Sequence, residues 1–131
     1  MTGMPASLKS AWSAYREGEP ELALKEFEEL AAGDSSPHPL IQKGLFFFHL
    51  ERHVEAVTTF EEAIKLQPQN PAALFFHALA LELSGEVSQS QSAVAKLREV
   101  CPHHQGIPSL ILLSELRHGD PLPHLVQMGY G

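Results

Sequence analysis

The chain has 131 residues, the length of one ordinary domain. Hydrophobic residues make up 44% of it and charged residues 19%, so it has enough apolar material for a core and is not a disordered protein. The formal net charge is -7, which excludes a general nucleic-acid binder because there is no basic surface to neutralise phosphates. The same charge disfavours anionic membrane surfaces.

The sequence predicts a protein of the cytoplasm, or a piece of one, with no membrane-inserted segment. No stretch approaches the roughly 20 apolar residues that a bilayer-spanning helix needs. The N-terminus has no basic segment followed by an apolar run, so no signal peptide is visible. Cys101 is the only cysteine, which excludes an internal disulfide and fits a reducing compartment.

Prolines and capping residues mark the helices in chain order. Pro20, Pro37 and Pro71 each suit the first position of a helix, where the missing N–H costs nothing. Ser36 and Asn70 precede two of these prolines, as N-caps do. Together with the apolar spacing, these signals predict helices over residues 5–17, 20–32, 37–50, 53–66, 71–83 and 87–100.

A seventh helix is expected over residues 107–118, where apolar side chains recur at helical spacing. Arg117 and His118 suit the end of that helix, and Gly119 suits its C-cap. The tail, 119–131, forms either a short eighth helix that begins at Pro121 or a flexible end. The sequence does not decide between the two.

Two segments of 34 residues, 37–70 and 71–104, align without a gap. Their apolar and small residues recur in register, and Pro68 and Pro102 close the two units. The first segment carries its pattern at Leu40, Gly44, Phe47, Ala56, Phe60, Ala63 and Pro68, and departs from it only at Lys43. The second follows that pattern less closely, with Ala78, Ser90 and Val94 at three of the places.

Residues 4–36 fit as a first unit through their second helix. Their first helix fits in two phases. Either Ala11 and Ala14, or Trp12 and Tyr15, face the second helix. Both phases remain open at this point.

This period and residue pattern resemble the tetratricopeptide repeat over roughly residues 4–104. The resemblance implies an all-α fold, a helical-repeat solenoid of three antiparallel helix pairs plus a C-terminal capping helix. We expect one domain over 1–131, with repeats at about 4–36, 37–70 and 71–104, the capping helix at about 107–118 and the tail at 119–131. Glu51 stands where the other repeats have a turn glycine, which predicts a tighter or strained turn.

In this family the first helix of each pair lines a concave face that holds peptides. Each side chain that aligns there can also be explained by packing between helices, but as a set they predict an apolar groove. The two residues from the first repeat belong to it in only one of the two phases. The aligned positions are Leu8, Trp12, Ile41, Leu45, Phe48, Phe75, Leu79 and Glu82.

The groove predicts a non-catalytic adaptor or scaffold whose partner is another protein. That partner would supply a hydrophobic peptide or an amphipathic helix. Two alternatives are a small chaperone that shields a hydrophobic segment of its partner, and a structural module that self-associates. The chain's own tail, from Leu122 to Met128, is a further candidate for the groove.

Two electrostatic alternatives carry less weight. One subclass of the family binds acidic C-termini of heat-shock chaperones through Lys, Arg and Asn side chains. The aligned positions here carry Leu8, Trp12, Gln42 and apolar groups instead. Seven of the 16 acidic residues lie between Glu17 and Asp34, which indicates a solvated helix face rather than a docking surface for a basic partner.

We expect no catalytic site, metal or cofactor. His49 and His53 are four residues apart, but they span a predicted helix end and lack the glutamate of a zinc-protease motif. His103 and His104 lie near Cys101, which would make only a weak adventitious metal site. No glycine-rich phosphate loop is present, so an enzyme is not predicted.

Overall fold

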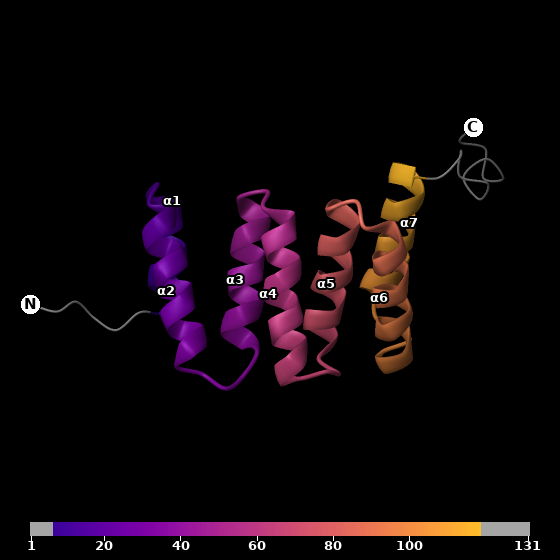
Figure 1. Cartoon of the computed structure of the whole chain (residues 1–131), viewed down its shortest axis with the longest axis horizontal. Coiled ribbons are helices and arrows are strands. Elements are labelled where there is room, and N and C mark those ends of the chain that lie inside the picture. The colour runs from indigo at the N-terminus through magenta and orange to yellow at the C-terminus, as the bar shows by residue number, and fades with distance from the viewer. Residues whose placement is uncertain (1–6, 119–131) are drawn as a thin grey trace, which may run out of the picture.

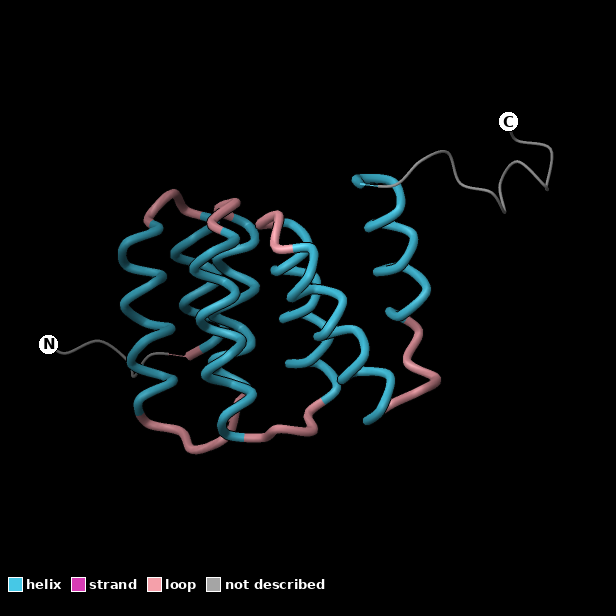
Figure 2. The backbone as a smooth tube through the Cα atoms, turned by 45° about the vertical axis from the view of Figure 1, so that its right-hand side comes forward, coloured by secondary structure: helices cyan, strands magenta, loops and turns pink. Residues whose placement is uncertain are grey.

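The computed structural model describes residues 7–118, which form seven α-helices and no strand (Figure 1, Figure 2). This confirms the predicted all-α helical-repeat fold. The tail at 119–131, for which the sequence allows either a short eighth helix or a flexible end, lies outside the described residues. The helices are α1 (Leu8–Arg16), α2 (Pro20–Ala32), α3 (His38–His49), α4 (His53–Leu66), α5 (Pro71–Leu83), α6 (Val87–Val100) and α7 (Gly106–His118).

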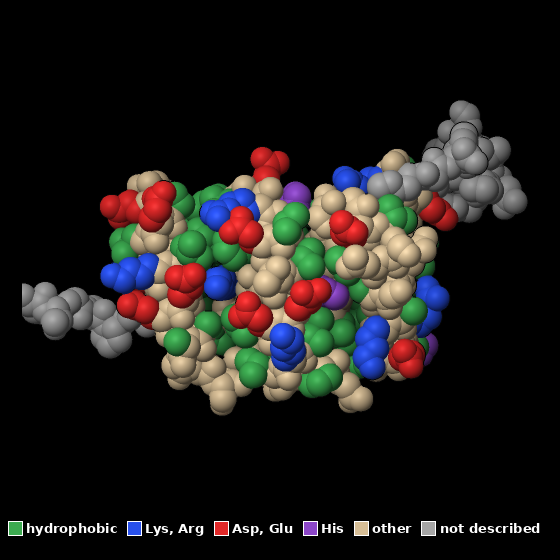
Figure 3. Space-filling model, in the orientation of Figure 1, with side chains coloured by type: hydrophobic (Ala, Val, Ile, Leu, Met, Phe, Trp, Pro, Cys, Tyr) green, Lys and Arg blue, Asp and Glu red, His purple; other side chains and the backbone are tan. Residues whose placement is uncertain are grey.

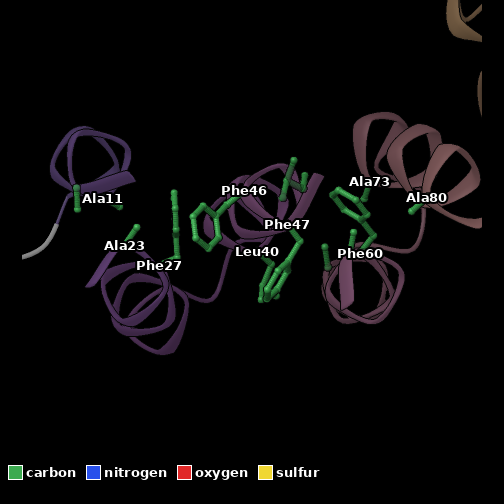
Figure 4. Close-up of a cluster of buried hydrophobic side chains, with 13 residues drawn as sticks. Ala11, Ala23, Phe27, Leu40, Phe46, Phe47, Phe60, Ala73 and Ala80 are labelled. Atoms are coloured by element: carbon green, nitrogen blue, oxygen red, sulfur yellow. The ribbon is translucent and has the colours of Figure 1, made fainter. Parts of the chain in front are cut away.

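The helices stand side by side in chain order from α1 to α7 (Figure 1). Figure 4 looks along the helices and shows two layers: α1, α3 and α5 on one side, and α2 and α4 on the other. The first helices of successive pairs are therefore neighbours on one surface, which we call the α1–α3–α5 face. These three helices carry the residues that the sequence predicts to line a groove.

Capping residues set where the helices begin. The Oγ of Ser7 accepts the backbone N–H of Ser10 at 3.0 Å, and the N–H of Ser7 donates to Ser10 Oγ at 3.0 Å. This capping box starts α1 at Leu8, later than the expected residue 5. The carboxamide of Asn70 accepts the N–H of Ala73 at 3.0 Å, which confirms Asn70 as the N-cap of α5.

The start of α3 differs from the expectation. Pro37 takes the cap position itself, and the helix begins at His38 with Pro39 in its first turn. Ser36 is not an N-cap, because its backbone N–H donates to Asp34 Oδ1 at 2.8 Å in the preceding turn. That hydrogen bond lowers the pKa of the Asp34 carboxyl.

The turns inside the three repeats share one backbone conformation. Gly18 and Gly85 have φ angles of 85° and 87°, in the left-handed region that glycine enters without a steric penalty. Glu51 adopts the same region, with φ at 58°, although it carries a Cβ. The strained turn that the sequence indicates at Glu51 is therefore present.

Small residues allow the helices of each pair to approach closely. Ala11 and Ala14 are buried whereas Trp12 and Tyr15 are only partly buried, which favours the first of the two phases for this helix, although Trp12 also packs on Phe27 of α2 with centroids 5.2 Å apart. A Cβ at Gly44 would lie 2.4 Å from the ring of Phe60, so only glycine fits where α3 crosses α4. Figure 4 shows the core that results, with aromatic rings between the two layers.

The helix α7 closes the far end of the stack. Ile107 and Leu110 of α7 are buried in a cluster with Leu74 and Leu81 of α5 and Leu97 of α6. The apolar side chains of the last repeat are thereby covered by the chain itself. This is the role predicted for a capping helix.

Candidate functional site

Two seams run along the α1–α3–α5 face, one between α1 and α3 and one between α3 and α5, and a third lies between α5 and α7. The seam between α1 and α3 is held by Trp12, whose indole N–H donates to Gln42 Oε1 at 2.9 Å. The Trp12 ring also lies edge-on to Phe46, with centroids 6.3 Å apart, and packs on His49. Leu8 and Trp12 are partly buried here against the core, so this seam is filled by the chain's own side chains.

The seam between α3 and α5 contains a cavity of about 430 Å³, which we call the α3–α5 pocket. Two of the predicted groove residues, Ile41 and Leu45, line it from α3. The loop before α5 and the first two turns of α5 form the opposite wall. The lining residues are Pro37, His38, Ile41, Gln42, Leu45, Gln67, Asn70, Ala72 and Phe76.

Phe76 is the aromatic residue of this pocket, and the sequence pattern did not identify it. Its ring stacks on Phe60 with centroids 5.7 Å apart, and lies 6.4 Å from the ring of Phe48. Phe76 aligns with Gln42 in the 34-residue register, and Gln42 also faces the preceding first helix. The repeat register therefore contained a signal for Phe76, because it places Phe76 at the same position of its repeat as Gln42.

Phe48 of α3 lies in the same seam between α3 and α5. Its ring packs between Phe60, at a centroid distance of 5.5 Å, and His53, at 6.0 Å. Phe48 is partly buried and packs against the core, which makes it a support of the pocket wall. Ile41 is also buried, with 7% of its surface exposed, so Leu45 and Phe76 are the more open apolar side chains.

The seam between α5 and α7 is closed. Phe75, Leu79 and Glu82, which were predicted to line the groove, pack there against other parts of the chain. The Phe75 ring stacks on His104 at 5.2 Å, and a Cβ at Gly106 would lie 2.2 Å from it. Leu79 packs against the cluster that α7 completes.

Glu82 is 1% exposed and is held by Arg117, with 3.3 Å between Glu82 Oε2 and Arg117 Nε. The expectation that Glu82 faces an open groove is not met, because α7 covers it.

The described lining of the α3–α5 pocket contains no Lys, Arg, Asp or Glu. Its polar side chains are those of His38, Gln42, Gln67 and Asn70. The nearby Lys43 is drawn to α2, where its Nζ lies 3.7 Å from Glu28 Oε2. The pocket thus offers an apolar floor with an amide rim, which suits an uncharged group.

The acidic run between Glu17 and Asp34 lies on a surface of mixed charge. Figure 3 shows acidic side chains interspersed with Lys and Arg over the visible face. The ion pair between Lys43 and Glu28 brings one basic side chain into the run. This pattern fits a solvated helix face.

His49 and His53, the pair four residues apart, have different surroundings. His49 packs on Trp12 and Tyr15 at the end of α3, whereas His53 begins α4 and packs on Phe48. Within residues 7–118, no three His, Cys, Asp or Glu side chains are placed to hold a metal ion. Over the same residues, no helix has the length and apolar character to cross a bilayer.

A comparison with protein-family models finds the tetratricopeptide repeat, which matches residues 8–71 and, overlapping with them, 43–99. No curated protein matches the chain. The family match spans α1 to α6, including both walls of the α3–α5 pocket.

Solved structures share the fold at low sequence identity. One is the second tetratricopeptide domain of human RPAP3 with the HSP70 peptide SGPTIEEVD (TM-score 0.70, 16% identity, 86% of this chain and 94% of that chain). Another is the first such domain of Spaghetti (RPAP3) with the HSP90 peptide SRMEEVD (TM-score 0.67, 14% identity, 83% and 90%). A third is a MamA RS-1 double mutant (TM-score 0.71, 24% identity, 88% and 66%).

Proposed function

Because the chain belongs to the tetratricopeptide repeat family, we propose that it is a protein-interaction module that holds an apolar segment of another protein in the α3–α5 pocket. The observation that carries the proposal is the pocket itself, whose floor is formed by Ile41, Leu45 and Phe76. Apolar side chains on a concave floor with a polar rim are the usual composition of a binding pocket.

The uncharged lining decides which kind of segment is proposed. The two RPAP3 domains hold peptides that end in Glu-Glu-Val-Asp, which carry several negative charges. Binding such a peptide favours basic side chains, and no Lys or Arg is found among the described residues that line the α3–α5 pocket. The net charge of -7 would also repel an acidic partner. An apolar segment of low charge is therefore the better fit.

The experiment is an affinity capture from the native cell extract with three forms of the protein. Leu45→Glu places a charge in the pocket from a side chain that is only partly buried. Leu22→Glu is the matched control, since Leu22 is 43% exposed on α2, away from the pocket lining. Circular dichroism and a thermal melt first establish that both variants fold.

We expect proteins that are held by the wild type and by Leu22→Glu, and that are lost from Leu45→Glu. The partner is then confirmed by direct binding of its purified segment. If Leu45→Glu retains every protein that the wild type retains, the pocket is not the binding surface and the proposal fails.

A second candidate, self-association, is favoured by the outer face of α7. Leu116 is 64% exposed, and Ile111 and Leu112 beside it are also exposed. A cavity of about 290 Å³ lies between α6 and α7, with Ile111 and Val94 in its lining. Under this alternative the protein sediments as a multimer and Leu116→Glu makes it monomeric. A monomeric wild type would exclude it.

A further inference from the structure

The two glutamines on the rim of the α3–α5 pocket each accept a hydrogen bond from a neighbouring side chain through the amide oxygen. This inference rests on the proposed function and concerns the chemistry of the partner. A primary amide has an acceptor end and a donor end, and a neighbour that can only donate takes the acceptor end. The amide then turns its NH2 group elsewhere. Gln42 and Gln67 are both in this situation.

Gln42 is fixed by Trp12. The indole N–H is a donor with no acceptor capacity, and it lies 2.9 Å from Gln42 Oε1. The reverse orientation would set two donors against each other. The oxygen of Gln42 is therefore bonded to Trp12 in the seam between α1 and α3. Its NH2 group can then donate to a ligand in the pocket, which Gln42 also lines.

Gln67 is fixed through Asn70. The backbone N–H of Ala73 is a donor, and it lies 3.0 Å from Asn70 Oδ1. Asn70 must then donate through Nδ2, which lies 2.9 Å from Gln67 Oε1. This chain of hydrogen bonds leaves the NH2 group of Gln67 as the end that a ligand can use.

The geometry points to an extended peptide segment as the occupant of the α3–α5 pocket, with its backbone carbonyl oxygens on Gln42 and Gln67. One apolar side chain of that segment lies over Leu45 and Phe76. Two amide donors and an uncharged lining call for neutral acceptors, which peptide carbonyls supply. His38 on the rim can donate or accept according to its tautomer, so it sets no preference.

This assignment distinguishes an extended segment from an amphipathic helix. The carbonyl groups of a helix interior are already bonded to N–H groups four residues further on, so they are not free for Gln42 or Gln67. An extended segment has free carbonyls on both sides of each side chain. A carboxylate is also an acceptor, but the lining residues that the structure describes include no Lys or Arg to balance its charge.

The test begins with selection of random linear peptides displayed on phage against the full-length protein. The peptide recovered most often is synthesised as a C-terminal amide and as a free acid, and its Kd is measured by fluorescence anisotropy. The variants are Gln42→Glu and Gln67→Glu. Each replaces the NH2 donor by an acceptor while keeping an oxygen for Trp12 or Asn70. Gln91→Glu, exposed on α6, adds the same charge outside the α3–α5 pocket.

We expect the amide form to bind and each pocket variant to weaken it by about tenfold, the usual consequence of losing one hydrogen bond and leaving a carbonyl unpaired. The Gln91→Glu control should bind as the wild type does. In addition, sulfur is substituted for single carbonyl oxygens beside the anchoring side chain. Replacing the carbonyl oxygen that accepts from Gln42 should weaken binding to the wild type. The same replacement should not weaken binding to Gln42→Glu further, because that variant has already lost this hydrogen bond.

Three results would overturn the assignment and leave the proposed function standing. They are a peptide whose affinity neither glutamine variant changes, a peptide that binds only as the free acid, and a peptide that circular dichroism shows to be helical when bound. If selection yields no peptide that binds, both the assignment and the proposed function fail.

Discussion

Arg117 of α7 reaches back to Glu82 of α5, with 3.3 Å between Arg117 Nε and Glu82 Oε2, and Glu82 is 1% exposed. A carboxylate this deeply buried needs a compensating partner, because removing it from water is costly. The pair therefore ties α7 to the last repeat at the place where the family pattern would leave an open face. It also explains why the candidate site lies between α3 and α5 and does not extend to the end of the stack.

We expect Arg117→Met to lower the free energy of unfolding by about 1–3 kcal/mol, because Glu82 remains buried with fewer donors. Urea unfolding measures the change. Arg98→Met, at an exposed position of α6, is the control and should change stability by less than about 0.5 kcal/mol. The double variant Glu82→Leu with Arg117→Met should recover most of the loss. Equal stability of Arg117→Met and the wild type would contradict this account.

Gly44→Ala should destabilise the protein by about 1–3 kcal/mol, since the new methyl group would overlap the Phe60 ring. The Cβ position overlaps that buried ring, so either the ring or the two helices α3 and α4 must shift. Gly33→Ala is the matched control, because its Cβ would meet only Glu29 O at 3.6 Å. A thermal melt compares the two. A higher melting temperature for Gly44→Ala than for Gly33→Ala would show that the helices do not cross as described.

Glu51→Gly should stabilise the protein, by about 0.5–1 kcal/mol, because it removes a side chain from a left-handed backbone conformation. Gly85→Ala at the equivalent turn should act in the opposite direction by a similar amount. Chemical denaturation of both variants beside the wild type measures the difference. If both variants move stability in the same direction, the turn conformation is not the cause.

Much of the fold could be predicted from the sequence, because the ends of most helices are set by residues close to them in the chain. The bounds of α2, α4, α5 and α6 agree with the expectation, because prolines, turn residues and helical periodicity mark them in the sequence. The start of α3 was wrong, since Asp34 draws Ser36 into a turn and Pro37 takes the cap. Two capping candidates in a row give no local signal for which one caps the helix.

The candidate site was only partly predictable. The repeat register gives each residue a position within its own helix pair, and on that basis it identified Ile41 and Leu45. It does not give the offset between neighbouring first helices, so Phe76 was missed and Phe75 was chosen in its place. The cover over Glu82 depends on how α7 docks, which is a tertiary contact outside the repeated segment.

The most direct measurement of the central claim is a titration of the isotope-labelled protein with the selected peptide, followed by amide chemical shifts. The account predicts that the largest shifts fall on the backbone amides of Ile41, Gln42, Leu45 and Phe76, which line the α3–α5 pocket. Shifts that concentrate on α2 or on the outer face of α7, with these four amides unchanged, would contradict it.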